Sequence, residues 1–577
     1  MRVRQYFKRA LCGVLAASLT MGIAGCQPKE PAVDEKYQYE GIEYVGKAEK
    51  DNFALLYNTL GYEQKSTKKA FVRSLEYVAP DQIGSNSLWT LLDKEGNVVS
   101  QGPLAYRGLS YGLQLWEADF SDVQRAGTYQ LVAELTDAEG AVFYQEMSLD
   151  FLVQNRIFSQ NVILPLTLYN AQARVAPESL GGGYYDCNTT MGEAYSHGSF
   201  LNGLVQTYVY QRAFLSQSER DGLQEAAAIA FDYLKNLHQD SGEFLHSDPR
   251  RYNADINQGF HNTYEALYGF SAYLYYFSDI DPDRANQENY ERAAKSVEYL
   301  NLNLTEEMAA GMGYPNKEYL TPVYYYLYKF SGDEKWKDMG IEAINKQLDR
   351  TNLRTMYRTG SKVIPLFEGV YLFMKEFPDH PDYATWVEKL TKIKDEYYKV
   401  LVEENAFAIQ PISEGMLAEK EWDNMWQLPT GEYADIQWQL TSARAPNAMD
   451  ACFLGELTGD KSLEEVATGE LGYILGLNAG FSGDLVVNPT TDKKHVAGAF
   501  VQNLPGRTVR GWSHWEFPMQ NDEWMSIMNG FRMIDGDYYF ADNSTDDWYY
   551  GEVFIRYDGA FAYAFCVYEN FVNAVNP

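Results

Sequence analysis

Carboxyl groups near the C-terminal end of the chain are the first candidates for chemistry. Glu552 follows Asp546, Asp547 and the aromatic run Trp548-Tyr549-Tyr550. Like charge and partial desolvation raise the pKa of a carboxyl group, and a carboxyl that keeps its proton near neutral pH can act as a general acid. The alternative interpretation is an ordinary surface glutamate at the start of a helix, where negative charge is favoured.

A second set of candidates lies around a glycine-rich turn. The run Gly182-Gly183-Tyr184-Tyr185-Asp186-Cys187-Asn188-Thr189 ends in polar residues, and Glu193 follows shortly after it. The Asp186 carboxylate could hold a water molecule or accept a proton from one. The alternative is an aspartate that only caps the turn through its own backbone.

The first element that must position these groups is a β domain. From Phe53 to about Val153, short apolar runs of period two alternate with turns, as in Trp89-Thr90-Leu91-Leu92 followed by Asp93-Lys94-Glu95-Gly96. This pattern predicts a small immunoglobulin-like β-sandwich, which we place at residues 51–154.

After Gln154 the apolar period becomes that of helices. Phe200, Leu204 and Tyr208 recur at four-residue spacing, as expected for one face of a helix. Similar stretches predict further helices at about 158–176, 223–234, 262–277, 289–300, 319–331, 364–376, 383–403, 444–458, 463–477 and 560–574. Roughly a dozen helices in one domain at 155–577, with long loops at 404–440 and 478–550, predict helices paired around a closed ring. The loops would then carry the functional site.

The N-terminal residues predict export and lipidation. Basic residues precede an apolar run from Ala10 to Ile23, which is shorter than the ~20 residues of a membrane span. The run ends in Ile23-Ala24-Gly25-Cys26, which resembles the lipobox of bacterial lipoproteins. We therefore expect a signal peptide at 1–25, a lipid on Cys26, and a flexible tether over 26–50. The protein would be extracytoplasmic and held at the membrane through this anchor alone.

Composition narrows the possible partners. The formal net charge of −32 makes nucleic acid an unfavourable partner. The 46 Tyr and 11 Trp residues offer ring faces for stacking on sugars, although packing in a large core is the alternative explanation. Apart from Cys12 in the signal peptide and Cys26 at the lipid site, the three remaining cysteines are scattered and form neither a disulfide framework nor a zinc motif.

Several motifs resemble those of glycoside hydrolase family 9. Asn58-Thr59-Leu60-Gly61-Tyr62 and Ala126-Gly127-Thr128-Tyr129 resemble parts of the immunoglobulin-like module that precedes many catalytic domains of this family. The run from Gly182 to Thr189 is similar to the family's Gly-Gly-Trp/Tyr-x-Asp-Ala-Gly-Asp, and Tyr473-Ile474-Leu475-Gly476 to its "Y-I-L-G" helix. Trp548 to Glu552 resembles the stretch that bears the acid. The resemblance implies a mainly α fold, an (α/α)6 barrel preceded by an immunoglobulin-like β-sandwich.

The resemblance also implies an activity, the inverting hydrolysis of β-glycosidic bonds in an extracellular polysaccharide or oligosaccharide. Glu552 takes the place of the general acid, but the place of the base holds Thr189, whose hydroxyl cannot accept a proton as a carboxylate does. Three explanations stay open. Asp186 alone holds the attacking water, Glu193 is brought in by a reshaped loop, or hydrolysis has been lost.

Residues expected to contact the sugar come from the long loops and the glycine-rich turn. The family's sugar-gripping "His-His-Arg" stretch has a partial match at His495 and Arg507. Trp512, Trp515 and Tyr185 offer further contacts, and the alternative for each is loop packing or surface exposure. No metal site and no required cofactor are expected, and no loop motif supports structural calcium.

Two other functions remain possible on this scaffold. The replacement of the base by Thr189 is also compatible with a non-catalytic, glycan-binding surface lipoprotein. A weaker alternative is a polysaccharide lyase that uses Tyr185 as the base on a uronate-containing chain, with Arg507 and Arg510 as its basic patch.

Overall fold

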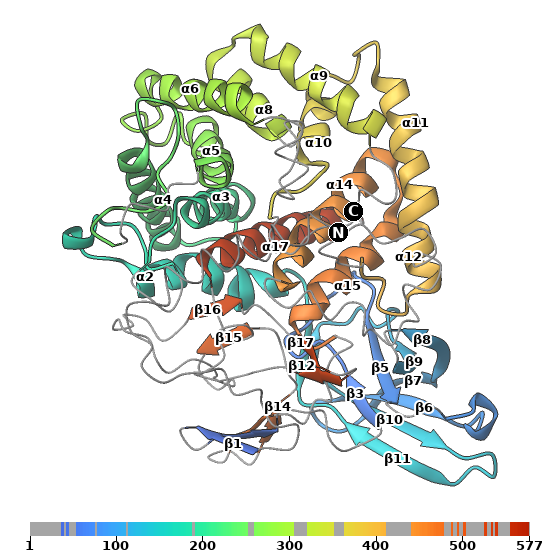
Figure 1. The fold of residues 1–577 in the computed structure, drawn as a ribbon. Coiled ribbons are helices and arrows are strands. Elements are labelled where there is room, and N and C mark those ends of the chain that lie inside the picture. Colours follow the sequence, from blue (N-terminus) through green and yellow to red (C-terminus); the bar gives the residue numbers. More distant parts are fainter. Residues whose placement is uncertain are drawn as a thin grey trace, which may run out of the picture.

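A computed structural model describes most of the two expected domains. The described residues are 36–39, 42–45, 53–74, 78–110, 113–186, 191–251, 259–304, 320–350, 363–410, 440–477, 486–488, 493–495, 500–503, 524–527, 532–534, 537–539 and 554–575. Figure 1 shows strands gathered below a ring of helices.

The N-terminal domain is a β-sandwich, as predicted. One sheet has the order β3-β5-β9-β8, formed by Phe53–Leu56, Lys69–Ser74, Leu113–Asp119 and Ala105–Ser110. The other has the order β4-β12-β10-β6-β7, formed by Gly61–Glu63, Phe151–Gln154, Gly127–Thr136, Leu88–Asp93 and Val98–Pro103, and β11 (Val142–Met147) also pairs with β10. Alternate residues of β10, such as Tyr129, Leu131 and Ala133, are buried against Trp89 and Trp116. The period-two pattern of the sequence is the consequence of this one-sided burial.

Short strands also occur outside the sandwich. β1 (Lys36–Tyr39), β2 (Ile42–Val45), β13 (Val486–Asn488) and β14 (Lys493–His495) form a four-stranded sheet. β15 (Phe500–Asn503) pairs with β16 (Trp524–Ile527), and β17 (Arg532–Ile534) pairs with β18 (Asp537–Tyr539). The region 478–550, predicted as a loop, therefore contains strands of three or four residues, which are too short for a period-two pattern to reveal.

The C-terminal domain is an (α/α)6 barrel. Among the described residues, an inner ring is formed by α3 (Ala194–Gln211), α5 (Gly259–Tyr276), α8 (Thr321–Ser331), α10 (Glu368–Glu376), α14 (Arg444–Thr458) and α17 (Ile555–Val575). Each of these helices contacts the next, and α17 closes the ring by contacting both α14 and α3. The mainly α fold and the barrel predicted from the sequence are confirmed.

Outer helices alternate with the inner ones along the chain. The first outer helix consists of η2 (Ser159–Ile163), η3 (Pro165–Tyr169) and α2 (Asn170–Arg174), and the others are α4 (Gln217–Leu237), α6 (Gln287–Asn303), α9 (Glu334–Arg350), α11 (Tyr383–Ile393) continued by η7 (Lys394–Tyr398) and α12 (Lys399–Glu404), and α15 (Glu464–Ile474). Single 3-10 turns lie at η1 (Pro80–Gln82), η4 (Glu178–Leu180), η8 (Leu440–Ala443) and η9 (Lys461–Leu463). The sequence pattern missed α9, because Trp336, Ile344 and Leu348 make only a narrow apolar stripe among charged residues.

Glycines let the inner helices approach one another at backbone distance. A Cβ atom added to Gly203 of α3 would lie 2.4 Å from the Cα of Gly559 in α17. A Cβ added to Gly269 of α5 would lie 2.0 Å from the carbonyl oxygen of Gly198 in α3. Since no side chain fits at these crossings, α3 is packed directly between α5 and α17, and the beginnings of these helices come close together.

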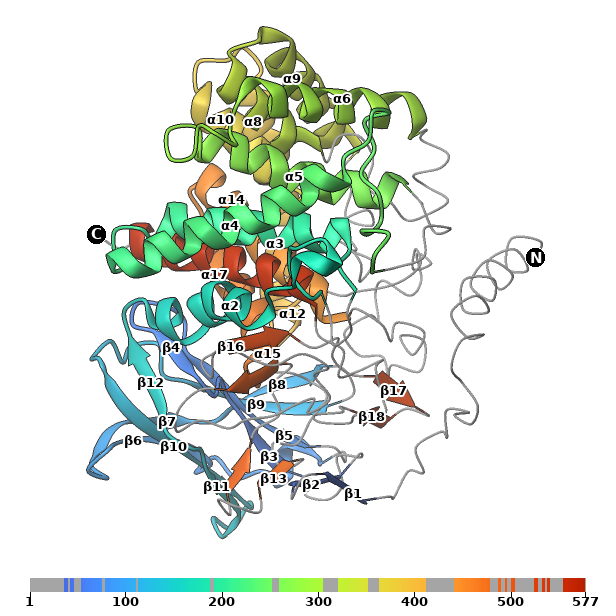
Figure 2. The same ribbon diagram turned by 90° about the vertical axis from the view of Figure 1, so that its left-hand side faces the viewer.

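The two domains share a polar boundary. The Glu63 carboxylate of the sandwich accepts hydrogen bonds from the backbone N–H groups of Arg156 and Ile157 at 3.0 and 2.7 Å, at the start of the first outer helix. Glu569 of α17 accepts from the next two N–H groups, those of Phe158 and Ser159, both at 3.0 Å. These two carboxylates satisfy the amides that a helix start leaves unpaired. Figure 2 shows the sandwich lying against the α2 and α15 side of the barrel.

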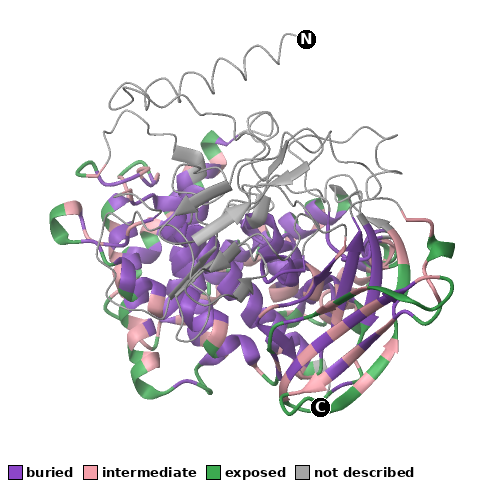
Figure 3. Ribbon diagram, turned by 90° about the horizontal axis from the view of Figure 1, so that it is seen from below, coloured by how far each residue is buried: buried purple, intermediate pink, exposed green. Residues whose placement is uncertain are grey.

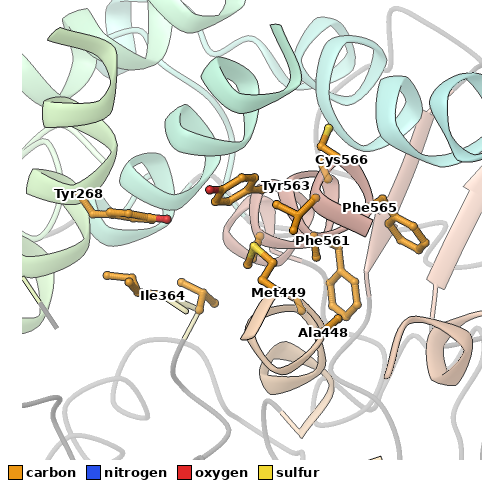
Figure 4. Close-up of a cluster of buried hydrophobic side chains, with 14 of the residues drawn as sticks. Tyr268, Ile364, Ala448, Met449, Phe561, Tyr563, Phe565 and Cys566 are labelled. Atoms are coloured by element: carbon orange, nitrogen blue, oxygen red, sulfur yellow. The ribbon is translucent and has the colours of Figure 1, made fainter. Parts of the chain in front are cut away.

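The barrel interior is apolar and rich in tyrosine. In Figure 3 the described helices are mostly buried, whereas the outer strands of the sandwich are partly exposed. The hydroxyl groups of Tyr268, Tyr326 and Tyr563 all donate to the single buried carboxyl of Glu368 in α10. Figure 4 shows the hydroxyl ends of Tyr268 and Tyr563 directed toward one another. Burial raises the pKa of Glu368 to about 7, although the three tyrosines oppose this shift.

In the part of the chain that the structure describes, no helix combines the length and the apolar character needed to cross a membrane.

The Glu368 cluster predicts a pH-dependent stability. Because its folded pKa of about 7 lies above the ordinary value of 4.5, this group stabilises the fold fully below about pH 4.5. That contribution is lost as the pH rises through 7. The shift corresponds to roughly 3 kcal/mol. Chemical denaturation at about pH 5 and pH 8 should show a smaller loss of unfolding free energy in Glu368→Gln than in the wild type. The exposed Glu342→Gln serves as the control, and an unchanged slope in Glu368→Gln would contradict the assignment.

Candidate active site

A glycine turn delivers Asp186 to the beginning of the inner helices. Gly181, Gly182 and Gly183 have φ angles of +92°, +71° and +73°, which side chains rarely tolerate. A Cβ added to Gly183 would also lie 2.7 Å from the Tyr233 ring. The local conformation and the neighbouring ring therefore both require glycine at position 183.

Three hydrogen bonds fix the backbone of Asp186. Its N–H donates to the Met191 carbonyl at 2.9 Å, and its carbonyl accepts from the Ile555 N–H at 3.0 Å. The same carbonyl accepts from the Arg174 guanidinium at 2.9 Å. The first outer helix and the beginning of α17 thus fix the position of this aspartate.

Arg251 and His197 hold the rest of the turn. The Arg251 guanidinium donates to the carbonyls of Leu180 and Tyr184 at 2.8 and 2.6 Å, and lies 5.9 Å from the ring centre of Tyr185. The buried ring of His197 accepts from the Tyr184 N–H and contacts the Glu193 carbonyl, both at 2.9 Å. Burial and the nearby Arg251 lower the pKa of His197 to about 3, so the ring is neutral and ties the turn to the start of α3.

The turn and the start of α3 bring two carboxyl groups together. The side chain of Asp186 is completely buried, and Glu193, which immediately precedes α3, is 6% exposed. Burial and the charge of Glu193 raise the pKa of Asp186 well above its ordinary range. Burial would also raise the pKa of Glu193, but hydrogen bonds with His246 and Asp186 outweigh it and lower this pKa to about 2. The pair therefore binds one proton tightly and keeps one negative charge.

His246 connects Glu193 to α5. Its Nε2 lies 3.2 Å from the Glu193 carboxylate, and its Nδ1 lies 3.2 Å from the side-chain oxygen of Asn262. Burial lowers the pKa of His246, but the Glu193 contact outweighs it, so the pKa is raised overall. Both ring nitrogens face oxygen acceptors, as an imidazolium requires.

A buried ion pair lies beside the carboxyl pair. Arg556 at the start of α17 binds Glu265 of α5 through two of its nitrogens, one of them at 2.7 Å. The guanidinium also lies 5.0 Å from the centre of the Tyr195 ring. Burial and the charges of Glu193 and Asp186 raise the pKa of Tyr195 well above its ordinary value, so its hydroxyl keeps its proton.

The structure brings together some of the residues predicted from the sequence. Asp186 and Glu193 form a pair, and Tyr185 lies half-buried beside them in the same turn. His495 belongs to strand β14, and its side chain is outside the described part of the structure. The predicted residues that lie outside the described residues are Cys26, Thr189, Arg507, Arg510, Trp512, Trp515 and Glu552.

Sequence reasoning missed His246, Glu265 and Arg556. A usable signal existed for Glu265, because it is a single charge within the aromatic and aliphatic run of α5. For His246 no signal was available, since its role depends on a loop folding back against Glu193. In the residues that the structure describes, no group of three or more His, Cys, Asp or Glu side chains is arranged to hold a metal ion.

Comparison with known proteins defines the class of fold. Residues 54–137 match the family of cellulase N-terminal ig-like domains. No curated protein has a sequence that matches this chain. The chain is similar in structure to a metagenome-derived glycoside hydrolase family 9 endoglucanase, with 14% identity over 90% of this chain and 99% of that one and a TM-score of 0.56.

Two further solved structures are similar to the same extent. The glycoside hydrolase family 9 endoglucanase J30 has 14% identity, covers 88% of this chain and 99% of its own, and gives a TM-score of 0.58. AaCel9A, solved in complex with cellobiose-like isofagomine, has 13% identity, covers 89% and 99%, and gives 0.55. The chain therefore has an N-terminal domain of the cellulase ig-like type and, as a whole, the fold of the family 9 endoglucanases.

The glycine turn predicts a local loss of stability on substitution. Gly183→Ala combines an unfavourable φ with a clash against Tyr233, whereas Gly459→Ala has a similar φ of +67° and nothing within 4 Å of the added Cβ. Gly183→Ala should lower the free energy of unfolding by at least about 1 kcal/mol more than Gly459→Ala. Urea denaturation of both variants measures the difference. Equal losses would show that the Tyr233 contact does not constrain the turn.

Proposed function

We propose that this protein hydrolyses β-glycosidic bonds in an extracellular polysaccharide or oligosaccharide, as a cellulase-like inverting enzyme. The observation that carries the proposal is the buried pair of Asp186 and Glu193 at the start of an inner helix, in a chain with the fold of family 9 endoglucanases. Perturbed carboxyl pairs of this kind are typical of catalytic sites.

Inverting hydrolysis requires one protonated and one ionised carboxyl group about 6.5–9.5 Å apart. We assign the proton-donating role to Glu552. It precedes Ile555 by three positions, and the Ile555 N–H is hydrogen-bonded to the Asp186 carbonyl. Three residues of chain span at most roughly 11 Å, which sets an upper limit on the separation of the Glu552 and Ile555 backbones.

The carboxyl pair provides the base that Thr189 cannot provide. With one proton shared between two carboxyl groups, the pair retains a carboxylate at neutral pH that can accept a proton from water. The substrate would be held by Tyr185 together with His495, Arg507, Trp512 and Trp515. A β-linked glycan is favoured because AaCel9A, which has a similar fold, was solved with a cellobiose-like ligand.

The proposed location follows from the N-terminal sequence. Lipidation of Cys26 would hold the enzyme at a membrane outside the cytoplasm, at the cell surface or in the periplasm, with residues 26–50 as the tether. An anchored enzyme of this kind would act on glycans close to the cell.

A non-catalytic glycan receptor is the second candidate. The observation that favours it is burial, since Asp186 is 0% and Glu193 only 6% exposed. A receptor would keep the barrel and its aromatic residues without needing water at these carboxyl groups.

Sugar release decides between the two functions. The protein lacking residues 1–25 should release soluble sugar from at least one member of a panel of β-glucans, xyloglucan, mannan and chitosan oligomers. Glu552→Gln should lower this rate by about 10²–10⁴-fold, the usual contribution of a general acid. Glu334→Gln, at a side chain that is 63% exposed, is the control and should leave the rate unchanged.

Proton NMR of the first product should show the inverted anomer. Absence of activity on the whole panel, together with measurable binding to one glycan, would replace the proposed hydrolase by the receptor.

A further inference from the structure

We propose that Glu193 is the base that activates water, that His246 holds it in the ionised form, and that Asp186 carries the proton of the pair as a positioning residue. The inference rests on the proposed hydrolysis and assigns the role that the sequence left open between Asp186 and Glu193.

Hydrogen-bond donors distinguish the two carboxyl groups. His246 Nε2 lies 3.2 Å from one oxygen of the Glu193 carboxylate, and the Ser196 hydroxyl donates a hydrogen bond to the other oxygen at 3.4 Å. Both carboxyl oxygens of Asp186 are buried without a hydrogen bond of ordinary geometry from the described residues, and the nearby Glu193 and Ser196 act on its pKa in opposite directions. A buried carboxylate without donors is costly, whereas a protonated carboxyl can donate to a neighbouring carboxylate. The proton therefore belongs on Asp186.

The charges around the pair support the same assignment. Glu193 is faced by His246 from the loop before α5, by Tyr195 and Ser196 from α3, and by Glu265 from α5. Glu265 is already paired with Arg556, which leaves His246 as the cation for Glu193.

The cations near Asp186 act mainly on the backbone. The guanidinium groups of Arg174 and Arg251 donate to the backbone carbonyls of Asp186 and Tyr184. Burial and the charge of Glu193 raise the pKa of Asp186 overall, because they outweigh the charge of Arg174, which lowers it.

Exposure shows which carboxyl group water can reach. The side chains of Glu193 and His246 are 7% and 18% exposed, whereas Asp186 is 0% exposed. Glu193 is therefore the member of the pair that keeps some contact with solvent, and the exposed edge of His246 adjoins it. We assign the attacking water to Glu193 for this reason.

The resulting step balances protons and bonds. A water molecule bound at Glu193 loses one proton to the Glu193 carboxylate while its oxygen forms a bond to the anomeric carbon. The bond from that carbon to the glycosidic oxygen breaks, and the leaving oxygen takes the proton of Glu552. Glu193 then returns its proton and Glu552 regains one through solvent. The proton on Asp186 is not transferred.

Amide variants separate the two roles. Asp186→Asn keeps the shape and the donor capacity of a protonated aspartic acid, so its kcat should stay within about tenfold of the wild type. Glu193→Gln removes the only negative charge of the pair and should lower kcat by about 10²–10⁴-fold. The opposite result, an inactive Asp186→Asn beside an active Glu193→Gln, would reverse the assignment.

Chemical rescue covers the case in which both amide variants are inactive. Formate or azide should restore part of the activity of Glu193→Ala, because a small anion can occupy the place of the missing carboxylate. Neither anion should restore Asp186→Ala, where the missing group is uncharged. Rescue of Asp186→Ala, or failure to rescue Glu193→Ala, would overturn the inference.

A measurement without substrate tests the charge assignment separately. With ring-labelled histidine, NMR should show His246 titrating above the ordinary histidine pKa, since the Glu193 contact raises it. This midpoint should fall in Glu193→Gln and stay in place in Asp186→Asn. A midpoint at or below the ordinary value would overturn the inference even in an active enzyme. Inactivity of the wild type on every glycan would instead overturn the proposed function.

Discussion

The direct backbone contact of α3 with its two neighbours is the constraint on which this barrel depends. Gly203 against Gly559, and Gly198 against Gly269, leave no room for a side chain at either crossing. Helices that approach this closely cannot slide past one another without a clash, so their relative positions are fixed. Their N-terminal ends are fixed as well, which places Glu193 and Arg556 at the starts of α3 and α17, near Glu265 in the second turn of α5.

The packing of the inner helices brings several ionisable side chains together in a buried region near the beginning of α3 and α17. Among the described residues, the carboxyl groups of Asp186, Glu193 and Glu265 lie together, with ion pairs from Arg556 to Glu265 and from His246 to Glu193. Burying an uncompensated carboxylate costs several kcal/mol, so the fold reaches electrical balance by retaining a proton. A site that stores one proton next to one negative charge is a natural arrangement for chemistry in which protons are exchanged with a substrate.

The sequence predicted the architecture better than the site. The sandwich and most of the helices left a clear period in the apolar residues, because burial on one side imposes that period. Helix α9 was missed, since its apolar stripe is narrow. Asp186 could be named from its motif and Glu193 as a nearby carboxyl group, but nothing in the order of residues placed His246 or Arg556 beside them. Such contacts join residues that are distant in the chain, and only packing brings them together.

The Glu63 side chain joins the N-terminal domain, which is synthesised first, to the beginning of the barrel that follows it. This side chain of the sandwich binds the N–H groups of Arg156 and Ile157 at the beginning of the barrel's first helix. On the ribosome an N-terminal domain folds before the remainder of the chain is complete. The Glu63 side chain is therefore in place when the next helix emerges, and its oxygens can accept hydrogen bonds from the first N–H groups of that helix. A contact formed in this order sets where the first helix of the barrel begins.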